Sequence, residues 1–159
     1  MRITFRKGAG FGTTSGVITT LGLIAGLNTG TQSTIAVLAG IVVLAVSDAL
    51  SDAMGIHVSE EAEDEHSARE IWEASAFTFL SKLSITLTFL VPITLLELQT
   101  AVATSAIWGL LLVAFFSFWM AKSQKKNPYK AVAEHIMITI LVIILTNYLG
   151  FLVYQIFMG

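Results

Sequence analysis

Residues 35–70 read IAVLAGIVVLAVSDALSDAMGIHVSEEAEDEHSARE, an apolar run that contains Asp48 and Asp52 and passes directly into an acidic segment. The apolar part is about as long as the 20 residues that a helix needs to cross a bilayer. An ionised side chain at that depth costs about 2.5–3.5 kcal/mol on insertion scales, so it usually faces a bundle interior or a polar path. This stretch predicts a membrane helix with two buried carboxylates near one end.

The composition of the whole chain agrees with a membrane protein. Of its 159 residues, 55% are hydrophobic and only 13% are charged, and the mean hydropathy is +0.78. The net charge of −2 offers no basic surplus for nucleic acid. Cysteine is absent, which excludes a disulfide framework and thiolate metal ligation. We therefore expect an integral, multi-pass membrane protein, in the plasma membrane if the source is prokaryotic, with lipid and not nucleic acid as a partner.

Five apolar stretches are long enough to cross a bilayer, and we expect helices over residues 11–27, 34–57, 74–96, 101–121 and 131–157. The connections at 28–33 and 97–100 are too short to hold a domain, so the helices that they join must be antiparallel. The expected fold is therefore all-α, with residues 1–159 as a single domain of five transmembrane helices. Residues 58–73 are expected to form an acidic cytoplasmic extension of the second helix.

The basic residues predict the orientation of the chain. They precede the first stretch and connect the second to the third and the fourth to the fifth, whereas the other connections and the C-terminal end have none. Because cytoplasmic loops carry an excess of Lys and Arg, we expect a cytoplasmic N-terminus and an external C-terminus. Lys82 is the exception inside a span, and we expect its side chain to reach back toward the cytoplasmic surface.

The first apolar stretch is unusually rich in small and hydroxyl residues. Gly12 and Gly16 are four residues apart, as are Gly22 and Gly26, so small residues recur on one side of the predicted helix. Small residues let helix backbones approach closely within a membrane. We expect this helix to be enclosed by other helices or by a second subunit. Helix packing is the commoner explanation of such glycines, and lining a path is the alternative.

Asp48 and Asp52 are the first candidate metal ligands. At this spacing the two side chains share a helix face, with Cβ atoms about 6 Å apart. Two close carboxylates repel each other, and a divalent cation bound to both would relieve that repulsion. The alternative is structural neutralisation by Lys82 or by a helix N-terminus. A metal site is favoured because one lysine cannot fully compensate two acids.

The acidic segment supplies further candidate ligands, since five of the six residues at 60–65 are Asp or Glu. A continuous helix would place one set of side chains on one face and a second set in a parallel row: His57, Glu60, Glu61 and Asp64, then Glu63, His66, Glu70 and Glu73. Carboxylate and imidazole ligands suit Fe²⁺ and Mn²⁺. The alternative is a solvated acidic connector, which is the usual meaning of a block of like charges.

Sequence motifs of enzymes are missing. The chain has no His-Glu-x-x-His, no Gly-x-Ser-x-Gly and no cysteine nucleophile, so we do not expect an enzyme. Glu63-x-x-His66 has the spacing found in di-iron carboxylate bundles, although one such match carries little information in so acidic a run. A membrane di-metal oxidoreductase is therefore the least favoured alternative.

Three segments together resemble the vacuolar iron transporter family, the membrane carriers of ferrous iron and manganese. Residues 12–17, GTTSGV, are similar to the Gly-x-Asn-Asp-Gly-Leu opening of that family. Residues 49–59, ALSDAMGIHVS, are similar to its Ala-x-Ser-Met-Ala-x-Gly-Glu-x-Val-Ser end of the second helix. Residues 130–150 are similar to its last helix, so the resemblance covers nearly the whole chain.

The resemblance implies five helices, an acidic cytoplasmic segment that collects metal, and a homodimer with its path between the first two helices of each subunit. Ser15, Asp52 and Ile56 stand where the family has Asp, Met and Glu, so Asp48 and Asp52 would supply the charge of the path. We therefore expect a homodimeric carrier of Fe²⁺ or Mn²⁺, with the ion as cargo, no tightly bound cofactor, and proton exchange as one means of coupling. The alternative is a non-transporting metal sensor or scaffold, because the family's ligand positions are replaced.

Overall fold

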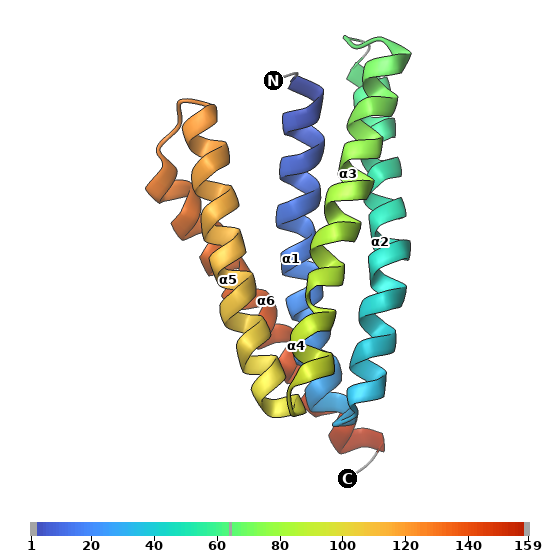
Figure 1. Ribbon diagram of the computed structural model, residues 1–159, viewed down its shortest axis with the longest axis vertical. Helices are drawn as coiled ribbons and strands as arrows, with labels where there is room; N and C mark the ends of the chain where they lie inside the picture. Colours follow the sequence, from blue (N-terminus) through green and yellow to red (C-terminus); the bar gives the residue numbers. More distant parts are fainter. Residues whose placement is uncertain (1–2, 64, 158–159) are drawn as a thin grey trace.

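The computed structural model describes residues 3–63 and 65–157, with side chains from residue 8 onward, and almost all of these residues are helical (Figure 1). The helices are α1 (Ile3–Thr31), α2 (Thr34–Glu63), α3 (Ala68–Thr88), α4 (Leu90–Leu95), α5 (Leu98–Ser123) and α6 (Pro128–Phe157). Counting α3 and α4 as one span, five segments are long and apolar enough to cross a membrane. The predicted all-α architecture with five spans is confirmed.

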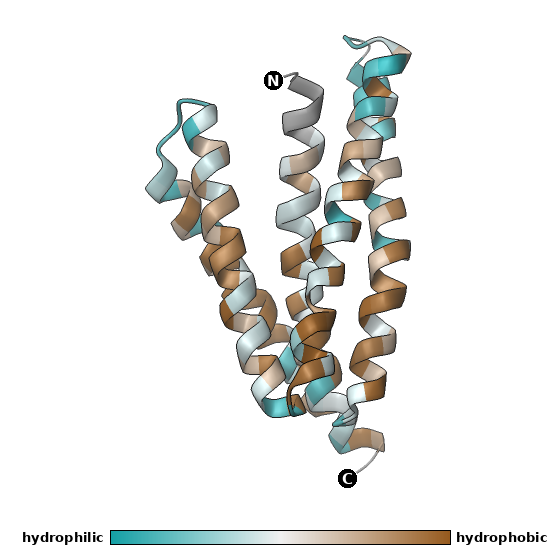
Figure 2. Cartoon of the chain, viewed as in Figure 1, coloured by the Kyte–Doolittle hydropathy of each residue, from teal (hydrophilic) through white to brown (hydrophobic). Residues whose placement is uncertain are grey.

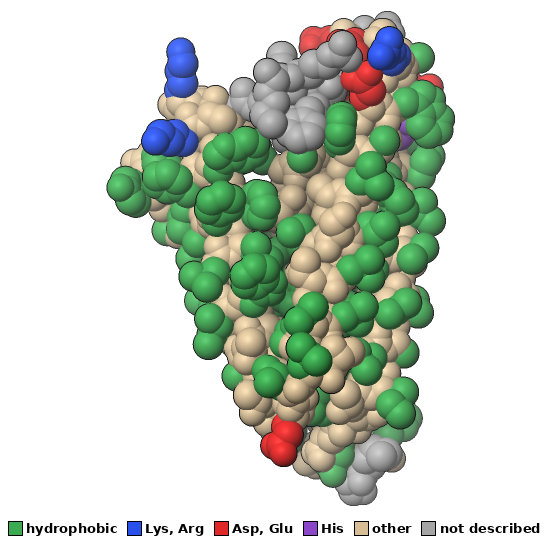
Figure 3. All heavy atoms as spheres, in the orientation of Figure 1, with side chains coloured by type: hydrophobic (Ala, Val, Ile, Leu, Met, Phe, Trp, Pro, Cys, Tyr) green, Lys and Arg blue, Asp and Glu red, His purple; other side chains and the backbone are tan. Residues whose placement is uncertain are grey.

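The two ends of the bundle differ in what they contain. The start of α1, the α2–α3 turn and the α5–α6 loop lie at one end, called here the N-terminal end, and the chain finishes at the other (Figure 1). Hydrophobic residues cover the length between them (Figure 2), and acidic and basic side chains gather at the N-terminal end (Figure 3). This is the charge distribution from which a cytoplasmic N-terminus was predicted, and that orientation stays a prediction.

Helix α1 is the central helix of the bundle. It packs against α2, α3, α5 and α6. Of its most apolar 18-residue stretch, 56% is buried inside the bundle, whereas only 11% of the corresponding stretch of α6 is buried. Its Val17, Leu21 and Ile24 form the hydrophobic core together with residues of α2, α4 and α5. The prediction that this polar helix is enclosed by other helices is therefore confirmed within a single chain.

The glycines of α1 lie against two different helices, α3 and α6. A Cβ atom added at Gly16 would lie 3.1 Å from Cγ of Lys82, so this glycine makes room for the lysine stem on α3. At the other end of α1, Gly26 and Gly30 lie against Gly150 of α6, where a Cβ on Gly150 would meet the Gly26 carbonyl oxygen. Close backbone approach, the commoner explanation of such glycines, accounts for both contacts.

The third span is interrupted, whereas the sequence predicted one helix over 74–96. Helix α3 ends at Thr88, Phe89 separates it from α4, and Pro92 lies in the first turn of α4. Proline has no N–H with which to bond the carbonyl of the residue four positions earlier, which here is Thr88. The break therefore follows directly from Pro92.

The predicted extension of the second helix through residue 73 is wrong in its second half. Helix α2 ends at Glu63, and α3 begins at Ala68. Ser67 is the N-cap of α3: its hydroxyl accepts a hydrogen bond from the backbone N–H of Glu70, whose side chain accepts one from the Ser67 N–H. This capping box starts a new helix. Residues 68–73 therefore belong to α3 and run back along α2.

The close contact between α1 and α6 gives a stability prediction. Gly150→Ala should lower the thermal unfolding temperature in detergent, because overpacking against backbone costs about 1–3 kcal/mol. Gly55→Ala is the matched control, since a Cβ there meets nothing within 4 Å. Its replacement should be neutral or gain about 0.5–1 kcal/mol of helix propensity. Equal shifts in the two variants would contradict the assigned contact.

Candidate functional site

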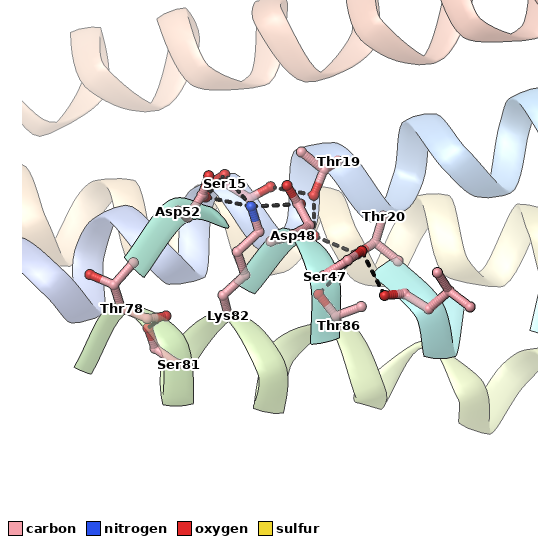
Figure 4. A network of polar contacts seen from close by, with 12 residues as sticks. Ser15, Thr19, Thr20, Ser47, Asp48, Asp52, Thr78, Ser81, Lys82 and Thr86 are labelled. Atoms are coloured by element: carbon pink, nitrogen blue, oxygen red, sulfur yellow. Dashed lines mark hydrogen bonds and ion pairs between the residues drawn. The ribbon is translucent and has the colours of Figure 1, made fainter. Parts of the chain in front are cut away.

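Lys82 of α3 joins α1 and α2 inside the bundle (Figure 4). Its Nζ lies 2.6 Å from Oδ2 of Asp48, also pairs with Oδ2 of Asp52, and donates a hydrogen bond of 3.0 Å to Oγ of Ser15. The Ser15 hydroxyl in turn donates to Oδ2 of Asp52 at 2.7 Å. These four residues are called here the ion network.

The prediction that Lys82 reaches back to the membrane surface is wrong. Its side chain is 1% exposed. Lys82 lies fourteen residues after Ala68, the first residue of α3, which at 1.5 Å per residue is about 21 Å along the helix. A lysine side chain does not span that distance to the N-terminal end of α3, and the ammonium pairs with the carboxylates of α2 instead. The structural alternative, in which Lys82 pairs with the two acids, is confirmed as a contact.

The hydroxyl and small residues of α1 determine where the ion network lies. Gly16 admits the aliphatic stem of Lys82, and Ser15 precedes it on the side of α2. One turn further, the Thr20 hydroxyl donates to Oγ1 of Thr86 at 3.2 Å and ties α1 to α3. The polar face of α1 is therefore turned toward α2 and α3, and not toward lipid.

The charges of the ion network do not balance. Two carboxylates and one ammonium leave one formal negative charge at a depth where a charge is costly. Oδ2 of Asp48 is buried and accepts no hydrogen bond of good geometry, so the ammonium meets it only as an ion pair. The side chains of Asp48 and Asp52 are still 23% and 20% exposed in the single chain. The network therefore holds an excess of negative charge and is partly open to the surface of the single chain.

A second group of potential ligands lies at the α2–α3 turn. One ligand atom each from Glu60, Glu63 and His66 lies within 4.8 Å of the others, and this is the one such group within residues 3–63 and 65–157. Glu60 is 4% exposed, and its Oε2 lies 3.1 Å from Nδ1 of His66. Two carboxylates and an imidazole could hold a hard or borderline divalent cation. These three residues are called here the turn cluster.

The residues of the two predicted rows of ligands do not all lie together in the structure. His57 turns toward α3, where its Nδ1 lies 3.3 Å from the Ser75 hydroxyl. Its ring packs against that of Trp72 in a tilted arrangement, with the ring centroids 4.5 Å apart. Glu61 is exposed, and Asp64 lies outside the described residues. His57 and Glu60, predicted to share a face, therefore have different neighbours.

The other two predicted ligands have roles within α3. Oε2 of Glu70 accepts hydrogen bonds from the Ser67 N–H at 3.0 Å and the Ser67 hydroxyl at 2.7 Å. Glu73 pairs with Arg69 at 3.0 Å. The second row was predicted on a continuous helix, and the turn at residues 65–67 brings only Glu63 and His66 of that row into the turn cluster.

Sequence reasoning omitted Ser15 and Lys82 from the site residues. A signal for Lys82 existed, because it is the one charged residue between Ala74 and Leu96. The signal for Ser15 was weaker, since a serine in a membrane helix often bonds its own backbone. Their contacts join residues far apart in the chain and depend on how three helices pack.

The ion network predicts a large stability effect for Lys82→Met. Removing one partner of a buried ion pair typically costs about 3–5 kcal/mol, because it leaves uncompensated charge. Lys130→Met is the matched control, since Lys130 and Glu134 are 75% and 54% exposed and their surface pair should contribute little. Denaturant unfolding of the purified variants in detergent measures both effects. Equal stability of the two variants would show that the ammonium does not hold the three helices together.

No family model matches the chain, and no curated protein matches it either. The resemblance to the vacuolar iron transporter family therefore stays a prediction from the residues quoted for it.

Proposed function

We propose that the chain is a membrane transporter of a divalent metal cation, Fe²⁺ or Mn²⁺. The main support is that one helix, α2, contributes acids to both candidate sites: two residues of the turn cluster at its end and both carboxylates of the ion network within its span. Asp52 and Glu60 are eight residues apart, which corresponds to about 12 Å along the helix. Ligands at both depths suit an ion that loses its water in steps.

The donor atoms favour hard and borderline cations. The turn cluster offers carboxylate and imidazole groups, and the ion network offers carboxylates and a serine hydroxyl. Oxygen and imidazole ligands suit Mn²⁺ and Fe²⁺ and give no preference to a soft ion such as Cu⁺. In this proposal the turn cluster captures the ion from solution and Asp48 and Asp52 receive it within the membrane.

A homodimer would complete this site. About one fifth of the Asp48 and Asp52 side chains is open to the surface of the single chain, at 23% and 20%. A carboxylate that faces lipid is costly, so a second copy of the chain packed beside α1 and α2 would cover these groups. This arrangement agrees with the path between subunits that the family resemblance implies.

The second candidate function is a membrane metal sensor or scaffold without transport. The observation that favours it is the pairing of Lys82 with both acids, which gives the intramembrane carboxylates a structural partner. In that case metal binds at the turn cluster alone and does not enter the membrane. Flux and binding measurements separate the two functions.

Asp48→Asn with Asp52→Asn should abolish Mn²⁺ flux into proteoliposomes that contain a metal-sensitive dye, because no anionic ligand remains in the ion network. Adding Lys82→Met to this pair removes the unpaired ammonium and controls for folding. Glu97→Gln, an exposed acid at the opposite end of the bundle, should leave flux unchanged. Wild-type flux in a well-folded double variant would refute transport through these acids.

Glu63→Gln with His66→Gln should remove one Mn²⁺ equivalent in equilibrium binding, because the turn cluster loses two of its three donors. Glu65→Gln, exposed in the same turn, is the matched control and should bind like the wild type. Binding at the turn cluster by a wild-type protein that moves no ion would support the sensor. Unchanged binding in the double variant would exclude the turn cluster as a site.

A further inference from the structure

We propose that Lys82 is a tethered counter-ion, whose ammonium occupies the place between Asp48 and Asp52 in the empty protein and competes with the metal for the same oxygen atoms. This inference rests on the proposed transport function and concerns how its intramembrane site binds and releases the ion. Lys82 would then be a specificity-determining residue of the site, and not only a structural one.

The contacts of the ammonium are those of a bound cation. An ammonium has three N–H donors and no acceptor, and Nζ of Lys82 has three oxygen partners: Oδ2 of Asp48, Oδ2 of Asp52 and Oγ of Ser15. A metal ion that binds Oδ2 of either carboxylate, or both oxygens of either group, would take an oxygen that the ammonium uses. The two cations therefore exclude each other from the centre of the network, as the placement of Nζ in Figure 4 illustrates.

The tether and the ligands belong to different helices. Both carboxylates come from α2 and the hydroxyl from α1, whereas the ammonium is carried by a flexible four-carbon stem on α3. Thr78 and Thr86, one turn before and after Lys82, are fully buried and offer hydroxyl oxygens that can accept a hydrogen bond. In this inference the ammonium moves along α3 toward these hydroxyls, and the ligands on α1 and α2 stay in place.

Competition of this kind would give the site the affinity that a carrier needs. Conduction and transport require binding strong enough for an ion to enter and weak enough for it to leave. Two carboxylates alone would hold a divalent cation strongly, because two unit negative charges attract it in a medium of low dielectric. The returning ammonium pairs with both carboxylates again and compensates one of their two negative charges as the ion departs.

The test compares Lys82→Ala with Lys82→Arg. Lys82→Ala removes the competitor, so Mn²⁺ should bind about tenfold or more tightly in equilibrium binding and flux should slow, with both KM and kcat falling. Lys82→Arg keeps the charge on a planar group that can bind carboxylates in a bidentate manner, so Mn²⁺ should bind more weakly than to the wild type. A purely structural lysine would make both variants bind more weakly, and that result would overturn the inference.

Chemical rescue keeps the test decisive if Lys82→Ala is unstable. Propylammonium should fill the space left by the side chain, raise the unfolding temperature of the variant and weaken its Mn²⁺ binding, whereas the neutral isostere propanol should do neither. Stabilisation by propylammonium without any effect on Mn²⁺ affinity would overturn the competition.

The two proposals fail in different ways. A wild-type protein that moves no Mn²⁺, but whose variants show opposite affinity shifts, would refute transport and keep the tethered counter-ion. A wild-type protein that transports Mn²⁺, but whose two variants shift affinity in the same direction, would keep transport and refute the counter-ion.

Discussion

Charged side chains inside an apolar helix bundle must find their partners within the protein, because lipid offers none. Lys82 meets that requirement through Asp48, Asp52 and Ser15, and the pairing places α3 beside both α1 and α2. The small residues of α1 follow from the same requirement, since Gly16 leaves space for the lysine stem where any larger side chain would press against it. One ionic contact thus constrains the composition of the central helix.

The regular parts of this fold could be predicted from local sequence, and the irregular parts had local signals as well. Stretches of apolar residues predicted the five spans, because length and hydropathy suffice for that inference. Pro92 and the Ser67-Ala68-Arg69-Glu70 capping box were also readable, and they account for the broken third span and for the turn that ends α2. The acidic residues at 60–65 do not themselves mark a helix end, and the signal for the new helix lies in the cap that follows them.

The candidate site was less predictable because its contacts are not local. Asp48 and Asp52 share a face by helical spacing alone, but their pairing with Lys82 spans about thirty positions in sequence and depends on the packing of three helices. The contacts within the turn cluster were also hard to predict from the sequence, although its residues are close together in the chain. Glu60, Glu63 and His66 come together because the chain reverses after Glu63, which no helical projection of the acidic segment could reproduce.

The proposed transport function requires a protein that stays folded both with and without its ion, and this requirement connects the stability of the bundle with its chemistry. Two carboxylates one turn apart on α2 would repel each other in an apolar surrounding if no cation lay beside them. An ammonium carried by α3 removes that difficulty, since it compensates one charge and pairs with both acids of α2. Any cation that enters must then bind the acids more favourably than an internal partner already present. Under the proposed transport function, the contact that stabilises the protein without its ion therefore also sets the affinity that the ion has to exceed.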